Sequence, residues 1–422
     1  MPEAHLKTII EHFSDGRLTS AYFSLQAESM TSHIMPTYGR LPVTFERGSG
    51  VWLWDTDNKR YLDALAGIAV CNLGHAHPAV HRAICKQSET LVHTSNVYGI
   101  AAQENLADRL IDKSGMDNVF FSNSGAEANE AAIKLARLYG HQRHIENPAI
   151  IVMEKSFHGR TLATLSATGN PKVQQGFAPL VEGFVRVPYN DIDAIEQAIG
   201  QHGNIVAILV EPVQGEGGVN IPASDYLNRI RNLCDQYNLL MMLDEIQTGI
   251  GRTGKFLAYQ HNSIVPDVCT LAKALGNGVP IGACLAHGKA AQLFSAGSHG
   301  STFGGNPLAC SAALAVLATL DHENLIEQVE QKGTAIHDGF AKQLGDNPHV
   351  VDIRHKGLMI GIELDAPCAE LVKSALQQGL LINVTSEKTI RLLPPLIIDD
   401  QQINQLVETL SALIQEHTRL CL

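Results

Sequence analysis

The chain has 422 residues, with 31 basic against 43 acidic side chains and a formal net charge of −12. With 45 % apolar and 18 % charged residues it is neither a disordered chain nor a collagen or a coiled coil, and its length suffices for a large buried core. The apolar runs are far shorter than the ~20 residues that cross a bilayer, and the acidic balance disfavours a nucleic-acid partner. We therefore expect a globular enzyme that contacts neither membrane nor nucleic acid.

The eight cysteines are spread along the chain without a CxxC pair or a regular spacing. Such a distribution is typical of free thiols in a reducing compartment. Residues 1–20 are polar and lack the apolar core of a signal peptide. Both observations predict a cytoplasmic protein.

The first predicted element is a short hairpin at residues 43–64. Through the middle of the chain, short apolar runs then alternate with helix-like segments. We expect strands at 119–122, 149–153, 206–211, 239–244, 268–272 and 282–286, and helices at 126–142, 191–202, 224–238 and 306–320. Several of these strands are continuously apolar, as strands buried on both faces are. The alternation predicts an α/β fold with a mostly parallel central sheet and helices on both faces.

The C-terminal part has a different pattern. A long helical stretch with breaks at 306–345 precedes expected strands at 350–364, 379–384 and 389–393 and an amphipathic helix at 400–419. With the N-terminal hairpin, these segments predict a small α+β domain built from both termini. We expect an N-terminal segment of that small domain at 1–75, a large domain at 76–315 and the C-terminal part of the small domain at 316–422.

In an open parallel sheet, ligands bind beyond the carboxyl ends of the strands, so the residues after each strand are candidates. Ser124, Gly125 and Ala126 follow the first strand and begin a helix, where Ser124 can cap and free N–H groups can bind an anion. The alternative is an ordinary capped helix. Asp244 ends another strand and could hold a cation, a metal or a protonated ring nitrogen, or form a salt bridge. Lys273 lies among apolar residues, where a lysine loses its proton easily and forms Schiff bases, unless it is a surface lysine.

Three further loops follow the strands. Phe157 and Arg160 offer an aromatic face and a guanidinium suited to a carboxylate. Residues 211–218 and 301–307 are glycine-rich, and each of these loops could be a mere turn. A phosphate cradle, a strand-end aspartate, an aromatic plate and a buried lysine together match one ligand, pyridoxal 5′-phosphate.

At this point the sequence resembles the class III pyridoxal-phosphate aminotransferases. The strings that carry the resemblance are SGAEAN (124–129), FHGR (157–160), LDEIQTGIGRTG (243–254) and AKALG (272–276), supported by TYGRLP (37–42), GHAHP (74–78) and GSTFGGNP (300–307). The similarity extends over residues 30–415 and is closest to the branch of the class that acts on N2-acetylornithine. It implies the fold-type-I aminotransferase architecture and a homodimer with active sites at its interface.

The resemblance also assigns the cofactor contacts. It makes Lys273 the Schiff-base lysine and proton shuttle, pairs Asp244 with the pyridinium nitrogen, places Gln247 near the ring hydroxyl and stacks Phe157 on the ring.

Backbone N–H groups of Gly125 and Ala126 would hold the phosphate. Position 126 is Thr in some relatives, so Ala126 supplies its N–H but no hydroxyl. Thr302 would reach the phosphate of the other subunit, with Ser301 beside it near the amino donor.

The substrates implied are N2-acetylornithine and 2-oxoglutarate, exchanged for glutamate in a ping-pong reaction. By resemblance, Arg160 binds the carboxylate far from the reacting carbon and Arg391 binds the α-carboxylate of glutamate. Glu216 would neutralise Arg391 when the ω-amine donor enters, because an unpaired buried arginine is unfavourable.

The choice of the amino donor depends on one position in the sequence. Where ornithine aminotransferases carry an aromatic hydroxyl residue, this chain has Ile68 in an apolar stretch. An apolar wall tolerates a neutral amide better than an ammonium group, which favours N2-acetylornithine. Ornithine, N-succinylornithine, N-succinyl-diaminopimelate and 4-aminobutyrate remain open.

Other classes fit less well. His75, His77 and His81 lie close together, but they lack the helical pair with a glutamate that zinc peptidases need, so no metal is expected. A nicotinamide enzyme would need a differently spaced glycine-rich turn. A non-catalytic binding module would be expected to lose Lys273. A mutase acting on glutamate 1-semialdehyde would need no arginine switch.

Overall fold

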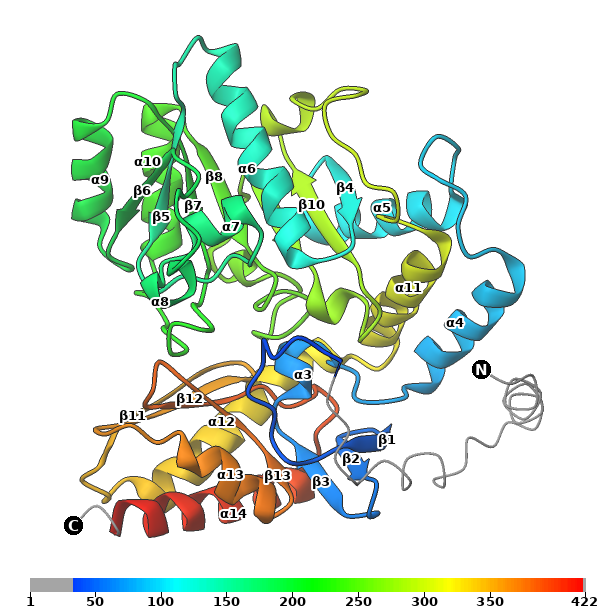
Figure 1. Ribbon diagram of the computed structural model, residues 1–422, viewed down its shortest axis with the longest axis vertical. Coiled ribbons are helices and arrows are strands. Elements are labelled where there is room, and N and C mark those ends of the chain that lie inside the picture. The colour runs from blue at the N-terminus through cyan, green and yellow to red at the C-terminus, as the bar shows by residue number, and fades with distance from the viewer. Residues whose placement is uncertain (1–32, 420–422) are drawn as a thin grey trace. The chain divides into compact units, whose positions relative to one another are not determined.

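The computed structural model describes residues 33–419. The expected absence of a signal peptide at residues 1–20, and Cys421, lie outside this range. The chain divides into two compact units, residues 1–47 with 54–60 and residues 48–53 with 61–422. In the described part of the first unit, the Arg47 guanidinium lies 4.0 Å from the Trp54 ring centroid, and Asp55 Oδ1 accepts two backbone N–H groups in the predicted turn. The second unit holds most of the elements (Figure 1).

A seven-stranded sheet forms the upper layer of the second unit in Figure 1. Its spatial order is β4-β10-β9-β8-β7-β5-β6. The strands are β4 (Asn118–Ser122), β5 (Ala149–Met153), β6 (Phe184–Val187), β7 (Ile205–Val210), β8 (Leu240–Asp244), β9 (Val268–Leu271) and β10 (Gly282–Ala286). Neighbours are parallel from β9 to β6, whereas β10 is antiparallel to both β4 and β9. The mostly parallel central sheet is therefore confirmed, with two additions: β6 was not predicted, and one strand runs against the others.

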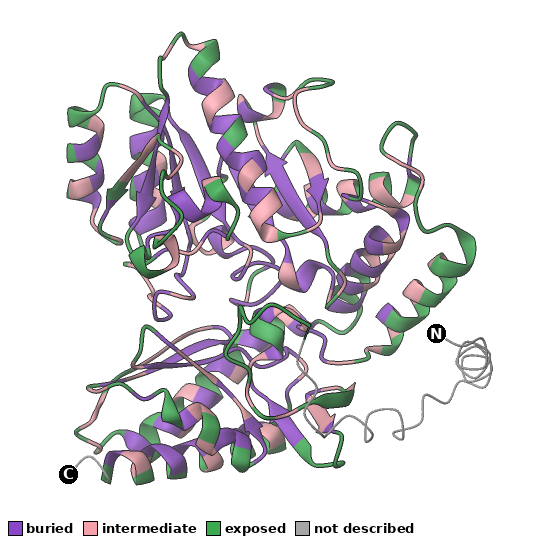
Figure 2. Cartoon of the chain, in the orientation of Figure 1, coloured by how far each residue is buried: buried purple, intermediate pink, exposed green. Residues whose placement is uncertain are grey.

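Helices cover both faces of this sheet. They are α4 (Pro78–Thr90), α5 (Ala101–Ser114), α6 (Gly125–Gln142), α7 (Leu162–Ala167), α8 (Pro171–Gln174), α9 (Ile192–Gln201), α10 (Tyr226–Tyr237) and α11 (Pro307–His322), with 3-10 turns η1 (Ala258–Asn262), η2 (Lys273–Leu275) and η3 (Ala290–Gln292). Alternate strand residues belong to different clusters: Leu240 and Met242 pack with α6, whereas Met241 and Leu243 pack with α10. This period of two, apolar on both faces, is why the strands read as continuous apolar runs. Figure 2 shows the inner strands β5, β7, β8, β9 and β10 buried throughout.

A second, four-stranded antiparallel sheet lies in the C-terminal part, in the order β11-β12-β15-β14. Its strands are β11 (Val350–Lys356), β12 (Met359–Leu364), β14 (Asn383–Thr385) and β15 (Thr389–Leu392). It is accompanied by α12 (Leu325–Leu344), α13 (Glu370–Gln377) and α14 (Asp400–Arg419). The remaining elements are β1 (Phe45–Ser49), β2 (Trp52–Asp55), β3 (Arg60–Asp63), α3 (Ala66–Ala69) and β13 (Leu380–Leu381). Leu380 of β13 pairs in parallel with Leu62 of β3, so residues from both ends of the chain meet, as expected.

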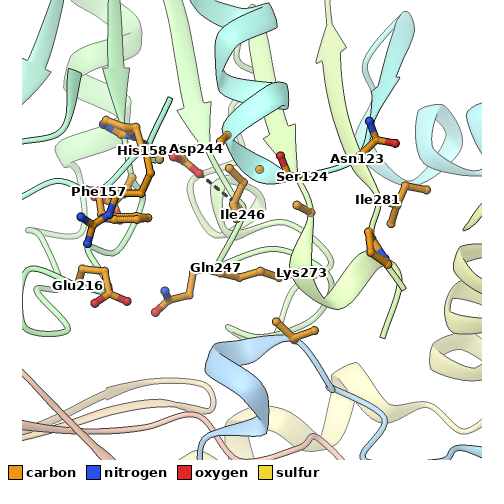
Figure 3. Close-up of a pocket in the computed structure, with 18 of the residues that line it drawn as sticks. Asn123, Ser124, Phe157, His158, Glu216, Asp244, Ile246, Gln247, Lys273 and Ile281 are labelled. Atoms are coloured by element: carbon orange, nitrogen blue, oxygen red, sulfur yellow. Dashed lines mark hydrogen bonds and ion pairs between the residues drawn. The ribbon is translucent and has the colours of Figure 1, made fainter. Parts of the chain in front are cut away.

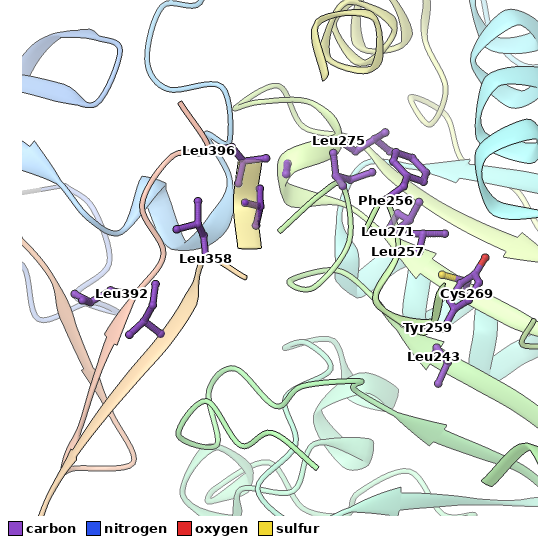
Figure 4. Packing of buried hydrophobic residues seen from close by; sticks show 14 of the residues in the cluster. Leu243, Phe256, Leu257, Tyr259, Cys269, Leu271, Leu275, Leu358, Leu392 and Leu396 are labelled. Atoms are coloured by element: carbon purple, nitrogen blue, oxygen red, sulfur yellow. The ribbon is translucent and has the colours of Figure 1, made fainter. Parts of the chain in front are cut away.

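The seven-stranded central sheet and the C-terminal sheet share one apolar cluster. Figure 4 shows Leu358, Leu392 and Leu396 from the C-terminal part and Leu243 and Leu271 from the central sheet in that cluster. No helix within residues 33–419 is both long and apolar enough to span a bilayer.

Buried Arg252 crosses the same region. Its guanidinium donates to Leu358 O (3.0 Å), to Pro394 O (2.6 Å) and to Asn72 Oδ1. Burial lowers the pKa of Arg252 to about 9. Its hydrogen bonds tie the loop after β8 to the C-terminal part and so hold the floor of the site described next.

Candidate active site

A pocket of about 400 Å³ lies at the carboxyl ends of the parallel strands (Figure 3). Its lining comes from the segments that follow β4, β5, β7, β8 and β9, which are the segments that sequence reasoning singled out. The size is that of a site for a small organic ligand.

Asp244 ends β8 and lies almost fully buried in this pocket. Its Oδ2 accepts hydrogen bonds from His158 Nδ1 and Asn129 Nδ2, both at 2.8 Å, and its Oδ1 accepts one from Ile246 N at 3.1 Å. Burial disfavours a charged imidazole, but the hydrogen bond to Asp244 and the charges of Asp244 and Glu211 outweigh it and raise the pKa of His158. The three donors thus hold the Asp244 carboxylate in a fixed orientation at the strand end.

Asn129 is a positioning residue that sequence reasoning did not assign. It is fully buried on α6, donates to His158 O at 2.8 Å and accepts from Thr270 Oγ1 at 2.8 Å, in addition to its bond to Asp244. It lies four residues after Gly125, hence on the same face of the helix. That spacing was the available signal.

Glu211 is a second positioning residue that sequence reasoning did not assign. Its carboxylate accepts Phe157 N at 3.1 Å and Gly215 N at 3.4 Å, so it joins the loop after β5 to the loop after β7. Burial and the charge of Asp244 raise the pKa of Glu211 to about 7, against the opposing charge of His158. Its position directly after a buried strand, like that of Asp244, was the signal.

Lys273 follows β9 and lines the same pocket. Its φ of +44° lies in the left-handed region, which a lysine occupies only when the surrounding structure enforces it. Burial and the charge of Arg391 lower the pKa of Lys273 below its ordinary value, against the opposing charges of Glu216 and Asp244. A neutral amine at this point can act as a nucleophile and a base.

The N-terminus of α6 forms the opposite wall. Ser124 Oγ caps the helix by accepting Glu127 N at 3.2 Å. The N–H groups of Gly125 and Ala126, at the first helical positions, have no acceptor inside the helix and are available to an anion. A Cβ on Gly125 would lie 2.7 Å from Ile246 Cδ1, so only glycine fits there without displacing a neighbour.

Phe157 and Arg160 line the pocket together. The Arg160 guanidinium lies 5.7 Å from the Phe157 ring centroid. Arg160 is exposed, so its guanidinium is accessible to a ligand carboxylate.

Arg391 comes from the other sheet, on β15, and is fully buried. Its Nη1 contacts Glu216 Oε1 at 2.6 Å and Gln247 Oε1 at 3.3 Å, and its Nε donates to Asn383 Oδ1 at 2.9 Å. Its Nη2 finds no hydrogen-bond partner among residues 33–419. The structure therefore brings Arg391, Glu216 and Gln247 together and leaves one buried N–H group for an incoming acceptor.

Three predicted site residues lie elsewhere. Among the described residues, the pocket lining includes neither Ser301 nor Thr302 nor Ile68. Ser301 Oγ is adjacent, accepting Asn123 Nδ2 at 3.2 Å, whereas Thr302 is exposed. Ile68 is 37 % exposed, and Val70 supplies the apolar wall instead.

The histidines considered for a metal have other partners. His75 Nε2 lies 2.7 Å from Asp63 Oδ2. Burial disfavours its protonation, but hydrogen bonds with Asp63 and Cys71 outweigh this and raise the pKa of His75 to about 9. Within residues 33–419, no group of three or more His, Cys, Asp or Glu residues is arranged to hold a metal ion.

A strand-end carboxylate, a nucleophilic lysine and a helix N-terminus on one parallel sheet define a site for a phosphorylated pyridine cofactor. The family model "Aminotransferase class-III" matches residues 34–414. The chain belongs to this family and is a transaminase, and its cofactor is pyridoxal 5′-phosphate. The residues present fit that cofactor: Lys273 for its aldehyde, Asp244 for its ring nitrogen and the start of α6 for its phosphate.

The chain is similar to acetylornithine aminotransferases. It is 58 % identical to the enzyme of Nitrosomonas europaea over 383 residues, covering 91 % of this chain and 98 % of that one. Acetylornithine aminotransferase 1 of Bordetella bronchiseptica is 52 % identical over 387 residues, covering 92 % and 98 %. Among solved structures, ornithine aminotransferase from Toxoplasma gondii matches with a TM-score of 0.88 and 34 % identity, covering 96 % and 99 %. Acetylornithine aminotransferase from Elizabethkingia anophelis matches with a TM-score of 0.82 and 36 % identity, covering 95 % and 100 %.

Proposed function

We propose that this transaminase moves the δ-amino group of N2-acetylornithine to 2-oxoglutarate, giving N-acetylglutamate 5-semialdehyde and glutamate, as a step of arginine biosynthesis. The observation that carries the proposal is the contact between buried Arg391 and partly exposed Glu216, at 2.6 Å. It fits an enzyme that alternates between a substrate with an α-carboxylate and one without. The names of the similar acetylornithine aminotransferases support the choice of donor.

The catalytic residues of the proposal are Lys273 and Asp244. The bound cofactor supplies an electron sink that stabilises negative charge on the reacting carbon. Asp244, held by its three donors, would place its carboxylate beside the ring nitrogen and so favour the protonated form of that nitrogen. Lys273, once its amine is free, would move the proton between the reacting carbon of the substrate and the aldehyde carbon of the cofactor. Phe157 would cover the ring, Gln247 would contact its hydroxyl, and Gly125 and Ala126 would bind the phosphate through their N–H groups.

The substrate-binding residues are the two arginines and their partner. Arg160 would bind the distal carboxylate of either substrate, where its exposure lets a ligand approach. Arg391 would bind the α-carboxylate of glutamate after Glu216 turns away. With the donor, whose reacting end carries no carboxylate, Glu216 stays paired and spares the pocket an uncompensated charge.

In the structure, the apolar wall that supports the donor preference is formed by residues other than Ile68. Val70 and Val213 line the pocket, whereas Ile68 does not. An apolar wall still favours a neutral acetamide over a free ammonium group.

We further propose a homodimer in which Thr302 and Ser301 complete the site of the other subunit. Thr302 is exposed beside Phe303, which is 61 % exposed, and Val97 and Tyr98 are 79 % and 69 % exposed. Exposed apolar residues of this size favour burial against a second copy. The division into segments 1–75, 76–315 and 316–422 and a cytoplasmic location remain part of the proposal.

The test compares kcat/KM for N2-acetylornithine and for ornithine with 2-oxoglutarate as acceptor, following glutamate. We expect a preference of at least tenfold for the acetylated donor, equivalent to about 1.4 kcal/mol. A preference for ornithine would contradict the argument from the apolar wall. Activity with neither would direct the assay to the succinylated donors and 4-aminobutyrate.

A further inference from the structure

The loop that carries Glu216 packs against one rung of the C-terminal sheet, that is, one row of residues paired directly across its four strands. In the register of that sheet, Arg354 of β11 pairs with Gly361 of β12, Gly361 pairs with Arg391 of β15, and Arg391 pairs with Asn383 of β14. Directly paired residues project from the same face of a sheet. Arg354 and Arg391 therefore stand on one face, two strands or about 10 Å apart, with a glycine between them.

The two arginines hold different parts of the same loop. Arg391 Nη1 contacts the side chain of Glu216. Arg354 instead holds the backbone, donating from Nε to Val219 O at 2.8 Å and from Nη2 to Gly218 O at 2.5 Å. The Arg354 guanidinium is itself fixed by the carboxylates of Asp352 at 2.7 Å and Glu363 at 3.0 Å.

Gly361 leaves the space that the loop fills. A Cβ at Gly361 would lie 3.0 Å from Val219 Cβ, tighter than ordinary contact. Val219 is fully buried and has a φ of +54°, a conformation that a β-branched residue adopts only under constraint. The strained residue thus sits against the gap in the rung, under the two hydrogen bonds from Arg354.

The ends of the loop are clamped separately. Gln214 and Asn220 pair through two backbone hydrogen bonds of 3.1 and 3.0 Å, and Gln214 Nε2 donates to Glu154 O at 2.7 Å. At the tip, Thr385 and Ser386 donate from their hydroxyls to the carbonyl of Glu216 itself. The backbone on both sides of Glu216 is therefore fixed, and its side chain is the part left to turn.

We propose that Arg354 is a positioning residue for the substrate switch: by anchoring residues 218 and 219 to the sheet rung, it holds Glu216 where its carboxylate pairs with Arg391. This inference rests on the proposed function, in which that pairing admits the donor. Without the anchor the strained loop relaxes, Glu216 withdraws, and Arg391 is left unpaired when the donor binds. Glutamate is unaffected, because its own carboxylate pairs with Arg391.

Three variants of the full-length holoenzyme test the anchor. Arg354→Ala removes both hydrogen bonds, and Arg354→Lys keeps the charge beside Glu363 but lacks the planar fork whose Nε and Nη2 reach the two carbonyls. Lys388→Ala is the matched control, because Lys388 Nζ pairs with the same Glu363 carboxylate at 3.0 Å and is not among the residues that hold the loop. We expect kcat/KM of the N2-acetylornithine half-reaction to fall about tenfold through KM in both Arg354 variants, with the glutamate half-reaction within about twofold of the parent. Lys388→Ala should match the parent in both half-reactions.

Amide hydrogen exchange over residues 214–220 reads the loop directly. Exchange should accelerate in both Arg354 variants and in Gly361→Ala, which displaces Val219 without changing any charge, but not in Lys388→Ala. Guanidinium ion, at a concentration that does not unfold the protein, should restore donor turnover in Arg354→Ala. If Arg354→Ala does not fold, Gly361→Ala carries the same two measurements.

Glu216→Gln separates this inference from the proposed function. If Glu216→Gln impairs the donor selectively while the Arg354 variants show neither the kinetic split nor faster exchange, the anchor is refuted and the switch stands. If Glu216→Gln impairs both half-reactions equally, the switch is refuted. The anchor is then upheld only by loop exchange that accelerates in Arg354→Ala and not in Lys388→Ala, and unchanged exchange overturns it as well.

Discussion

Gly125 offers a sharp test of the cofactor site, because two physical effects change the stability of the Gly125→Ala variant in opposite directions. Helix propensity predicts stabilisation by about 0.5–1 kcal/mol, since alanine restricts the unfolded chain. The structure predicts the reverse. A Cβ at this position would lie 2.7, 3.0 and 3.1 Å from the Cδ1, Cγ2 and Cγ1 atoms of Ile246.

The magnitude follows from what must move. Forcing one methyl group into a packed contact costs about 1–3 kcal/mol. Ile246 lies two residues after Asp244 and donates its N–H to Asp244 Oδ1, and its side chain lines the pocket. Its displacement disturbs the phosphate and ring ends of the site together. We expect the affinity for pyridoxal 5′-phosphate to fall about 5- to 150-fold in Gly125→Ala, the equivalent of that free energy.

The assay titrates pyridoxal 5′-phosphate into cofactor-free protein and follows its absorbance. Ile246→Ala removes all three contacting atoms, so cofactor affinity in the double variant should equal that of Ile246→Ala alone. A Gly125→Ala effect of the same size in both backgrounds would refute the steric reasoning, because the two changes would then be independent. Tighter cofactor binding in Gly125→Ala would contradict the predicted steric effect.

Other consequences concern the catalytic and buried charged groups. Lys273→Ala should abolish turnover and the absorbance band of the imine between the lysine and the cofactor; unchanged turnover would remove Lys273 from the mechanism. Arg160→Ala should raise KM for both N2-acetylornithine and 2-oxoglutarate, and sparing both would disprove its carboxylate role. Arg391→Ala should slow the glutamate half-reaction more than the donor half-reaction in single-turnover experiments, whereas equal losses would argue against the switch. Burial raises the pKa of Glu245 from 4.5 to about 7, so its contribution to stability is full below pH 4.5 and is lost as the pH rises through 7. Glu245→Gln should remove this loss of stability, which is of order 3 kcal/mol. The melting temperature of the variant should therefore rise relative to that of the parent between pH 5 and pH 8, and a difference that stays constant over this range would contradict the prediction.

The central sheet was largely predictable because its strands are buried on both faces. The two differences have local causes. β6 is a half-buried edge strand whose four residues include exposed Arg186, so it offers no apolar run. The reversal of β10 was open to inference, because residues 272–281 are fewer than the dozen or so that a parallel crossover needs.

The residues of the site were also predictable only in part. Residues that directly follow strands, such as Asp244 and Lys273, were found because the carboxyl ends of parallel strands converge. Ile68 was misplaced as a wall of the pocket because its backbone, with a φ of +69°, follows no regular period from which a side-chain direction can be read. Ser301 and Thr302 belong, in our proposal, to the other subunit, which one chain does not contain.

The arrangement of Arg354 and Arg391 could not be found from the sequence, since it depends on register. Two strand pairings must be known to place the two side chains on one rung, and a slip of one residue in either of them would turn one arginine to the opposite face. Local preference also points away from the conformations required. Lys273 and Val219 adopt φ values of +44° and +54°, which neither residue favours. The conformation of Val219 is supported by contacts with distant segments, namely the hydrogen bond from Arg354 and the space at Gly361. Strain of this kind identifies the residues whose positions the fold determines against their own preference, and here they are the proposed cofactor lysine itself and a residue three positions after Glu216.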